Sequence, residues 1–493
     1  MKKKSLEKNY IYNFISLILT LIIPLITTPY LARVFHESGN GQIAFANNIV
    51  SYFTMFANLG YLIYGQKEIA KYQDNDYMRS KTFWEIIIIR GVLTIISFVV
   101  LIATVNLNVY GASYNFLIMM FAIQIIAVAF DVTFYYQGLE DFRAIAVRTI
   151  VIRGSCLVLV FLLVKSEADI WIYAVLYSLS FLLANLLMWP KLYKSVFRVK
   201  LVDLEFKKHF LPSIIIFLPT LATTVYASLN KLMIGYLAVN PDYENGCYSQ
   251  ALKLNQTIRM LITVIDSVMM VRNFSDFAAK KYDSVKNHLY LACSYVIHLG
   301  IPLIFGICVL SSSLSAWFLG EGYVEVPMLL NIMSVRFVFS GLTCVFGNQL
   351  FIVIGKEKYT TWAHVAATAT NLLLNFIFIP KFGAIGAAIT FAIAEIVDCL
   401  VLAVLVFKDK YLSLKNVLKM FIKPVIAAGV MLLVIIPLNG YFAYNIFTFA
   451  LITAVGAGIY GITLLVMKDD FADLLLTRYA KPMINKFLLK YKR

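Results

Sequence analysis

The chain has 493 residues, of which 61% are hydrophobic and only 14% are charged, and its mean hydropathy is +0.79. This composition excludes an ordinary soluble domain, in which about a quarter of the residues carry a charge. The formal net charge of +16 does not indicate nucleic-acid binding, because the Lys and Arg residues stand in short clusters between apolar runs long enough to cross ~30 Å of hydrocarbon.

Apolar runs of membrane-spanning length follow one another along the whole chain. The first run is too long for a signal peptide and has no small-residue cleavage site after it, so we expect it to be retained as a helix. The sequence predicts an all-α membrane protein of about fourteen transmembrane helices. The expected spans are residues 11–35, 42–64, 83–105, 114–137, 145–165, 168–190, 210–238, 246–272, 288–310, 326–354, 358–379, 383–407, 417–437 and 443–467.

Basic residues are distributed unevenly between the loops on the two sides of these spans. Most of the 43 Lys and Arg residues lie at the N-terminus, in every second connection and in the C-terminal tail, whereas the opposite loops hold only Arg33, Lys165 and Lys381. By the positive-inside rule, both termini are expected on the cytoplasmic side of the inner membrane. The opposite loops are all short, the longest being about 311–325, which leaves no room for a folded catalytic domain.

A faint internal repeat relates the two halves of the chain. Gly41 opens the second span and Gly246 opens the eighth, six spans later, each after a segment rich in Pro and Thr. A repeat of an even number of spans keeps its orientation, so the halves are expected to be related by an axis along the membrane normal. We predict an N-terminal lobe at 1–200 and a C-terminal lobe at 201–410 around a central cavity, with two further helices and a basic tail at 411–493.

Small polar residues form stripes on several of the expected helices. Asn47, Ser51, Thr54 and Asn58 recur at spacings of three and four and so share one helix face. Thr224 on the seventh span and Gln256 on the eighth are assigned to the same cavity lining. The alternative is that these stripes only join packed helices.

Cations inside the spans are the strongest functional signal. Arg259 falls near the middle of the eighth span, where a lone Arg costs about 3 kcal/mol on insertion scales, so it needs a partner, water or an anionic substrate. Lys231 and Lys253 add two cations at shallower depth. Asp266 shares the Arg259 face, but it lies about 10 Å further along the helix axis and cannot pair with Arg259 directly.

Ionisable residues also occur near mid-membrane in the second half. Arg336, Glu395 and Asp398 are interpreted, with Asp266, either as structural pairs or as the site of a coupling cation, Na⁺ or H⁺. The six cysteines and five histidines show no metal-ligand spacing, and no metal site is predicted. No phosphate-binding or nucleophile motif is found either, so ATP hydrolysis and acyl transfer are unsupported.

The first seventy residues resemble the start of bacterial polysaccharide-biosynthesis flippases of the Wzx type, in the superfamily of the MATE exporters and lipid II flippases. The resemblance lies in 24–34 (PLITTPYLARV), Gly39-Asn-Gly41, Asn58-Leu-Gly60 and 64–70 (YGQKEIA). It implies two alternating lobes that move an undecaprenyl-pyrophosphate-linked oligosaccharide. It also places Arg33, with Lys231, Lys253 and Arg259, in a cationic cavity, where Arg offers bidentate donors to phosphate.

Other readings remain open from the sequence alone. They are a lipid II or other lipid flippase, a multidrug antiporter, and a membrane enzyme of polysaccharide assembly. The chain has no acidic residue between Glu7 and Glu37, where drug exporters often carry one, and this favours an anionic substrate. Expected partners are membrane lipids and a polysaccharide polymerase with its chain-length protein, and the default oligomeric state is a monomer.

Overall fold

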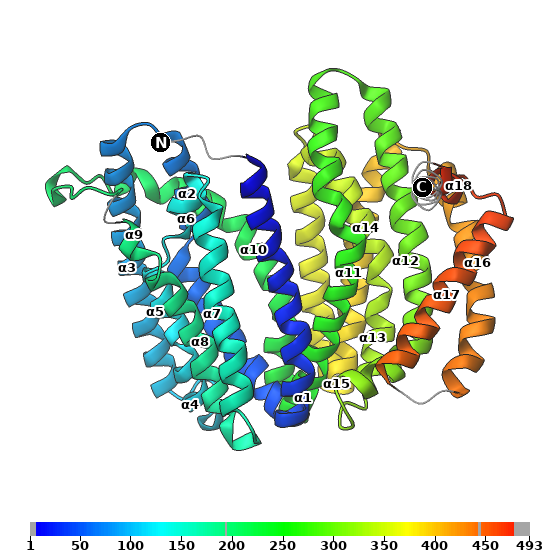
Figure 1. The fold of residues 1–493 in the computed structure, drawn as a ribbon, viewed down its shortest axis with the longest axis horizontal. Coiled ribbons are helices and arrows are strands. Elements are labelled where there is room, and N and C mark those ends of the chain that lie inside the picture. Colours follow the sequence, from blue (N-terminus) through cyan, green and yellow to red (C-terminus); the bar gives the residue numbers. More distant parts are fainter. Residues whose placement is uncertain (1–5, 193–194, 442–444, 478–493) are drawn as a thin grey trace, which may run out of the picture. The chain divides into compact units, whose positions relative to one another are not determined.

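The computed structural model describes residues 6–192, 195–441 and 445–477, and every regular element in these ranges is a helix (Figure 1). The elements are α1 Leu6–Asn58, α2 Tyr61–Lys71, α3 Asp76–Asn106, α4 Ala112–Phe121, α5 Ile123–Ala129, α6 Thr133–Gly138, α7 Phe142–Leu163, η1 Glu167–Asp169, α8 Ile170–Leu186, α9 Trp189–Leu192, η2 Leu201–Asp203, α10 Lys207–Leu237, α11 Pro241–Ala278, α12 Tyr282–Phe318, α13 Val326–Ser334, α14 Arg336–Phe346, the π-helical η3 Gly347–Ile352, α15 Glu357–Lys408, α16 Leu414–Tyr441, α17 Ile446–Val466 and α18 Asp470–Leu475.

The helices are long and apolar enough for a multi-pass membrane protein. Ten helical stretches among the described residues meet this test by length and composition. These ten count α15 once and leave out α1 and α10. Because α15 and α1 each contain two spans and α10 contains one, the total agrees with the fourteen predicted spans.

Two of the predicted helix pairs are joined without a loop. α1 changes direction at His36, whose φ is 50°, and α15 does so at Gly383, whose φ is 54°. These backbone angles lie in the left-handed region, which ends one helical hydrogen-bond ladder and lets the next begin. α1 and α15 therefore each contain two predicted spans.

Other predicted spans are interrupted instead. The second span was expected to reach residue 64, but its helix ends at Asn58, because Leu59 and Gly60 both take positive φ before α2 begins. The span expected at 114–137 is divided into α4, α5 and α6, and the span expected at 326–354 into α13, α14 and η3. Hydropathy detects an apolar run but not a change of backbone angle within it.

The chain forms two compact units. The first contains Met1–Tyr236 and Asn240–Ser249, and the second contains Leu237–Val239 and Gln250–Arg493. α10, which the sequence placed in the second lobe, is grouped with the first unit, and its His209 contacts Tyr64 and Glu85 there. The division into lobes at residue 200 remains a prediction.

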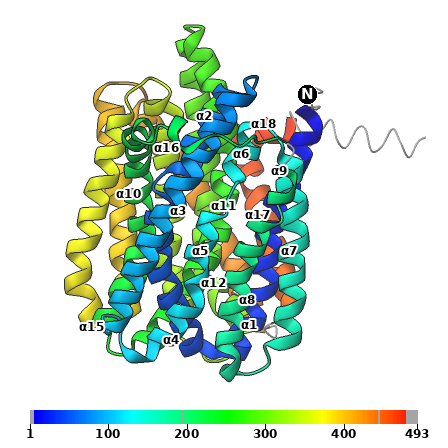
Figure 2. The same cartoon turned by 90° about the vertical axis from the view of Figure 1, so that its left-hand side faces the viewer.

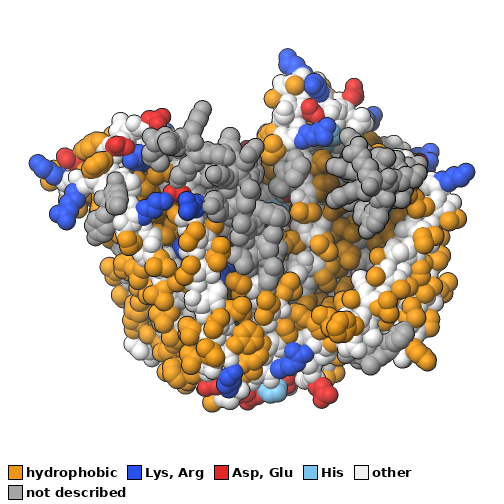
Figure 3. Space-filling model, in the orientation of Figure 1, with side chains coloured by type: hydrophobic (Ala, Val, Ile, Leu, Met, Phe, Trp, Pro, Cys, Tyr) orange, Lys and Arg blue, Asp and Glu red, His pale blue; other side chains and the backbone are white. Residues whose placement is uncertain are grey.

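The first unit is held by apolar packing between helices that run side by side, as Figure 2 shows for α3, α5 and α8. Its core includes Phe45, Ile49, Leu101, Phe121 and Ile125, all nearly inaccessible. The outer faces are equally apolar, as the orange flanks in Figure 3 show. On α3, for example, Val92, Ile95, Ile96 and Val99 are more than half exposed. Such surfaces suit a lipid environment.

Within the first unit, Gly41 of α1 packs against α11, and Gly246 of α11 packs against α1. A Cβ atom on Gly41 would overlap the backbone carbonyl of Asp242, and one on Gly246 would overlap the carbonyl of Glu37. Gln42 Nε2 donates to Asp242 Oδ2 at 2.9 Å beside this contact. The two halves of the repeat therefore meet through a reciprocal backbone contact that only glycine permits.

Candidate functional site

Arg259 and Lys231 are cations with no ion-pair partner in the part of the chain that the structure describes. Arg259 lies near the middle of the 38-residue α11 and is partly exposed, and among the described residues no side chain forms a hydrogen bond or ion pair with its guanidinium. Lys231, near the end of α10, is also partly exposed, and no described side chain forms a hydrogen bond or ion pair with its ammonium. Each charge is therefore available to water or to an anionic ligand.

Arg33 and Lys253 lie in more exposed positions. Arg33 Nη1 donates to the backbone oxygen of Pro29 at 3.1 Å, and Lys253 Nζ donates to Gln250 Oε1 at 3.5 Å. Arg33 and Lys231 belong to the first unit, whereas Lys253 and Arg259 belong to the second. Their convergence on one cavity stays a prediction.

Arg336 differs from Arg259 because three hydrogen bonds from its guanidinium go to side chains of the second unit. Nη2 and Nε donate to Glu395 Oε1 at 2.7 and 3.1 Å, Nη1 donates to Asn255 Oδ1 at 3.1 Å, and the Phe391 ring lies 3.9 Å from Cζ. Both Arg336 and Glu395 are less than a tenth exposed. This arrangement joins α14, α15 and α11 around a buried, charge-compensated guanidinium.

Asp398 also has a partner in the second unit. His364 Nδ1 lies 3.0 and 3.1 Å from its two carboxylate oxygens, and this bond connects the two halves of α15. About two helical turns from this pair, Asn371, Asn375 and Thr390 form a fully buried hydrogen-bonded group. The polar side chains of this region thus satisfy one another.

Asp266 is bound by two neighbouring amides. Asn348 Nδ2 donates to Oδ2 at 2.7 Å and Gln349 Nε2 donates to Oδ1 at 3.1 Å. Consecutive residues of an α-helix point about 100° apart, but Asn348 and Gln349 lie in the π-helical segment η3. The wider turn brings both side chains onto one carboxylate, and π segments recur at functional positions.

The predicted polar stripe of α1 lies in the first unit and is partly buried. Asn47 Oδ1 accepts from Gln124 Nε2 at 2.9 Å, while the hydroxyls of Ser51 and Thr54 donate to carbonyls of their own helix. No described group forms a hydrogen bond with Asn58 Oδ1. In the second unit Gln256 is exposed. The side chain of Thr224 lies outside the described part of the structure.

Several polar partners were not recognised in the sequence. Asn255 binds Arg336 across 81 residues, and His364 binds Asp398 across 34 residues. No spacing rule connects such positions, because the contacts run between different helices.

Comparisons with known proteins agree in sequence and in fold. The model of the family described as "Polysaccharide biosynthesis protein" matches residues 6–270, more than half of the chain. A protein of Escherichia coli (strain K12) named "Putative O-antigen transporter" is 24% identical over 403 residues, which cover 81% of this chain and 95% of that protein.

Solved structures show the same fold. "Lipid II flippase MurJ, inward closed conformation" superposes with a TM-score of 0.73 at 18% identity, covering 94% of this chain and 99% of the other. An inward-facing multidrug resistance MATE family transporter of the MOP superfamily superposes with a TM-score of 0.59 at 13% identity, covering 81% of this chain and 99% of the other. These likenesses establish the fold.

Proposed function

The chain belongs to the polysaccharide biosynthesis protein family, and we propose that it is a flippase for lipid-linked oligosaccharides rather than an enzyme. Its fold is that of membrane transporters, and its relative in Escherichia coli bears the name of an O-antigen transporter. The finer proposal is that an undecaprenyl-pyrophosphate-linked repeat unit crosses the cytoplasmic membrane by alternating access. The product would supply an O-antigen, a capsule or another exopolysaccharide.

The observation that carries the proposal is the contrast between Arg259 and Arg336. Both lie within membrane-spanning helices, yet Arg336 is neutralised by Glu395 while the guanidinium of Arg259 has no described partner and is partly exposed. An uncompensated Arg costs about 3 kcal/mol in a membrane, and a pyrophosphate would provide the missing counter-charge. Bidentate bonding to phosphate oxygens is the chemistry for which Arg is suited.

Lys231 supports the same proposal from the first unit, and Arg33 and Lys253 would add positive charge at shallower depth. Hydrogen-bonding groups such as Asn47, Gln256 and Asn58 are suited to sugar hydroxyls. The pyrophosphate would therefore bind the cations, and the oligosaccharide the polar side chains beside them.

The orientation in the membrane and the energy source are also part of the proposal. Both termini would be cytoplasmic, because the basic residues gather in the connections on that side. Transport coupled to Na⁺ or H⁺ would use an acid inside the helices, and Asp266 and Asp398 are the candidates. A monomer that works beside a polysaccharide polymerase and a chain-length protein completes the proposal.

The test is the location of the lipid-linked repeat unit in cells that lack this protein. A lectin or periplasmic ligase that reaches only the outer face reports which side carries the completed unit. The proposal expects complete units on the cytoplasmic face, and export restored by the wild type but not by Arg259→Ala. If complete single units reach the outer face and stay unpolymerised, the flippase assignment is wrong and an enzyme of assembly replaces it.

A further inference from the structure

The connection between α9 and α10 forms an apolar flap on the first unit that carries two exposed cations. We define it as residues 195–206. Phe197, Leu201 and Val202 in this flap are 56%, 72% and 94% exposed, and Arg198 and Lys200 are exposed between them. Large apolar side chains this exposed would be unfavourable in water by about 25 cal/mol for each Å². The composition matches the boundary between lipid headgroups and hydrocarbon.

Hydrogen bonds fix both ends of the flap to α3. At one end the backbone nitrogen of Phe197 donates to Ser80 Oγ at 3.1 Å, and Trp84 Nε1 donates to the oxygen of Phe197 at 2.9 Å. At the other end the nitrogen of Glu205 donates to the buried Glu85 Oε1 at 2.7 Å. The middle of the flap is therefore held out from the helix in a defined position.

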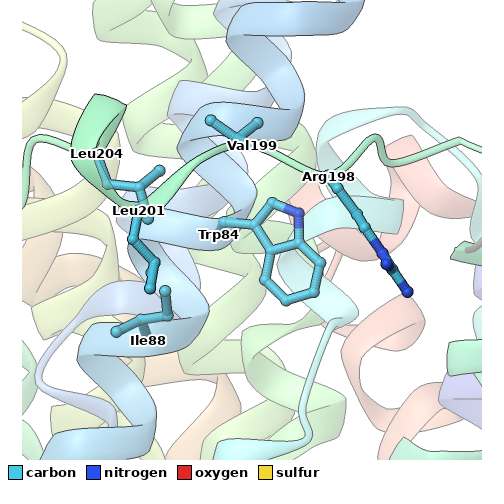
Figure 4. Close-up of a pocket in the computed structure, with 6 residues that line it drawn as sticks. All are labelled: Trp84, Ile88, Arg198, Val199, Leu201 and Leu204. Atoms are coloured by element: carbon cyan, nitrogen blue, oxygen red, sulfur yellow. The ribbon is translucent and has the colours of Figure 1, made fainter.

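A pocket of about 330 Å³ lies between the flap and α3, lined by Trp84, Ile88, Arg198, Val199, Leu201 and Leu204 (Figure 4). In Figure 4 the Trp84 ring stands between Arg198 on one side and Leu201 with Ile88 on the other. The pocket is thus apolar, with one guanidinium at its edge.

In the described part of the structure, neither acidic group of the flap forms an ion pair with this guanidinium. Glu205 is held by Lys81 at 2.7 Å and by Lys208 at 3.5 Å, and the Lys81 hydrogen bond lowers the pKa of the Glu205 carboxyl. Asp203 is the other acidic residue of the flap, and Arg198 and Lys200 are its two cations. Within the described residues, neither of these two cations forms an ion pair.

We propose that this pocket binds one anionic glycerophospholipid of the surrounding leaflet, with an acyl chain against Trp84 and Ile88 and its phosphate on Arg198. Trp is favoured at this depth because its ring is apolar and its N–H finds an acceptor, here the Phe197 oxygen. Arg binds phosphate through paired donors, and basic pockets beside membrane helices bind anionic headgroups. None of the residues that line the pocket is assigned to the proposed transport path, and the proposal does not depend on the transported substrate.

The test uses the full-length protein in nanodiscs that contain phosphatidylglycerol or phosphatidylcholine brominated on the acyl chains. Bromine quenches nearby tryptophan, and the part due to Trp84 is obtained by subtracting the Trp84→Phe variant from the protein with all five Trp residues. We expect stronger quenching by the brominated phosphatidylglycerol. The corresponding local enrichment is about fivefold, the equivalent of about 1 kcal/mol for one basic residue.

Arg198→Gln should remove the preference for the anionic lipid, whereas Lys286→Gln, an exposed cation in the second unit, should leave it unchanged. Native mass spectrometry of bound phosphatidylglycerol in the wild type and in Arg198→Gln gives the same comparison if Trp84→Phe does not fold. Equal quenching by both lipids, or a preference that survives Arg198→Gln, would overturn the proposal. Relief of the quenching by a small fraction of unlabelled undecaprenyl phosphate would also overturn it, by assigning the pocket to the transported lipid.

Discussion

At the scale of single residues, burial and pairing separate the arginines of the membrane helices into two kinds. Arg336 and Arg90 are almost inaccessible and lie beside Glu395 and Asp131. Arg259 is partly exposed and has no partner among the described side chains. The first kind holds helices together, whereas the second is available to a ligand, so their replacement should affect different measurements.

Replacing Arg336 with Met should destabilise the protein by about 3–5 kcal/mol, because it leaves Glu395 charged and buried without its partner. Thermal unfolding of the purified protein in detergent measures the effect. Arg259→Met should unfold within a few degrees of the wild type. The double variant Arg336→Met with Glu395→Leu should recover much of the loss, since no unpaired charge remains. Equal unfolding temperatures for Arg336→Met and Arg259→Met would contradict this account.

The sequence identifies ionisable residues in apolar runs, but it does not tell which of them are paired. Arg336 and Arg259 look alike in the printed chain, since each is one cation within a hydrophobic span. The difference arises from Asn255 and Glu395, which lie on other helices and meet Arg336 only after folding. Candidate residues can be predicted in this way, whereas their availability needs the structure.

At the scale of elements, backbone geometry decides where apolar runs bend and where they can touch. Periodicity and hydropathy predict the helices because the bilayer requires about twenty apolar residues for each span. They do not predict that His36 and Gly383 join two spans into one continuous element, nor that η3 is π-helical. The faint repeat at Gly41 and Gly246 did carry structural information, since the two glycines meet each other's helix.

Gly41→Ala and Gly246→Ala should each destabilise the first unit by about 1–3 kcal/mol, the usual range for overpacking. The added Cβ would overlap a backbone carbonyl, which cannot rotate away as a side chain can. Gly154→Ala is the matched control, because a Cβ there meets nothing within 4 Å. The midpoint of thermal unfolding reports the difference, and a control as unstable as the two variants would refute the reciprocal contact.

Glu85→Ala should release the 195–206 flap from α3. Glu85 is fully buried and binds the Glu205 nitrogen, His209 Nε2 at 2.6 Å and Lys208 Nζ at 3.1 Å. Without these bonds, trypsin in detergent should cleave after Arg198 and Lys200 several times faster than in the wild type. Asp203→Ala, which lies in the flap but forms none of these bonds, should be cleaved at the wild-type rate. Unchanged cleavage of Glu85→Ala would show that the flap is held by other contacts.

At the scale of the whole molecule, composition already separates this chain from soluble proteins and from enzymes with known motifs. The family match and the shared fold of lipid flippases and MATE transporters agree with that prediction. Fold alone does not choose the substrate, because one fold serves several substrates. The proposed substrate rests on Arg259 and Lys231, which form no ion pair with any described residue, and Arg259 is the residue on which it depends most.

The most direct test is translocation of an undecaprenyl-pyrophosphate-linked oligosaccharide by the purified protein in proteoliposomes. A fluorophore on the sugar and a quencher that does not cross the membrane report how much substrate has changed sides. The account predicts translocation faster than in empty liposomes, slowed about tenfold or more by Arg259→Gln through loss of charge-assisted bonds, and unchanged by Lys286→Gln. Wild-type rates in a well-folded Arg259→Gln variant would contradict the role of this cation, and no translocation by the wild type would contradict the flippase assignment itself.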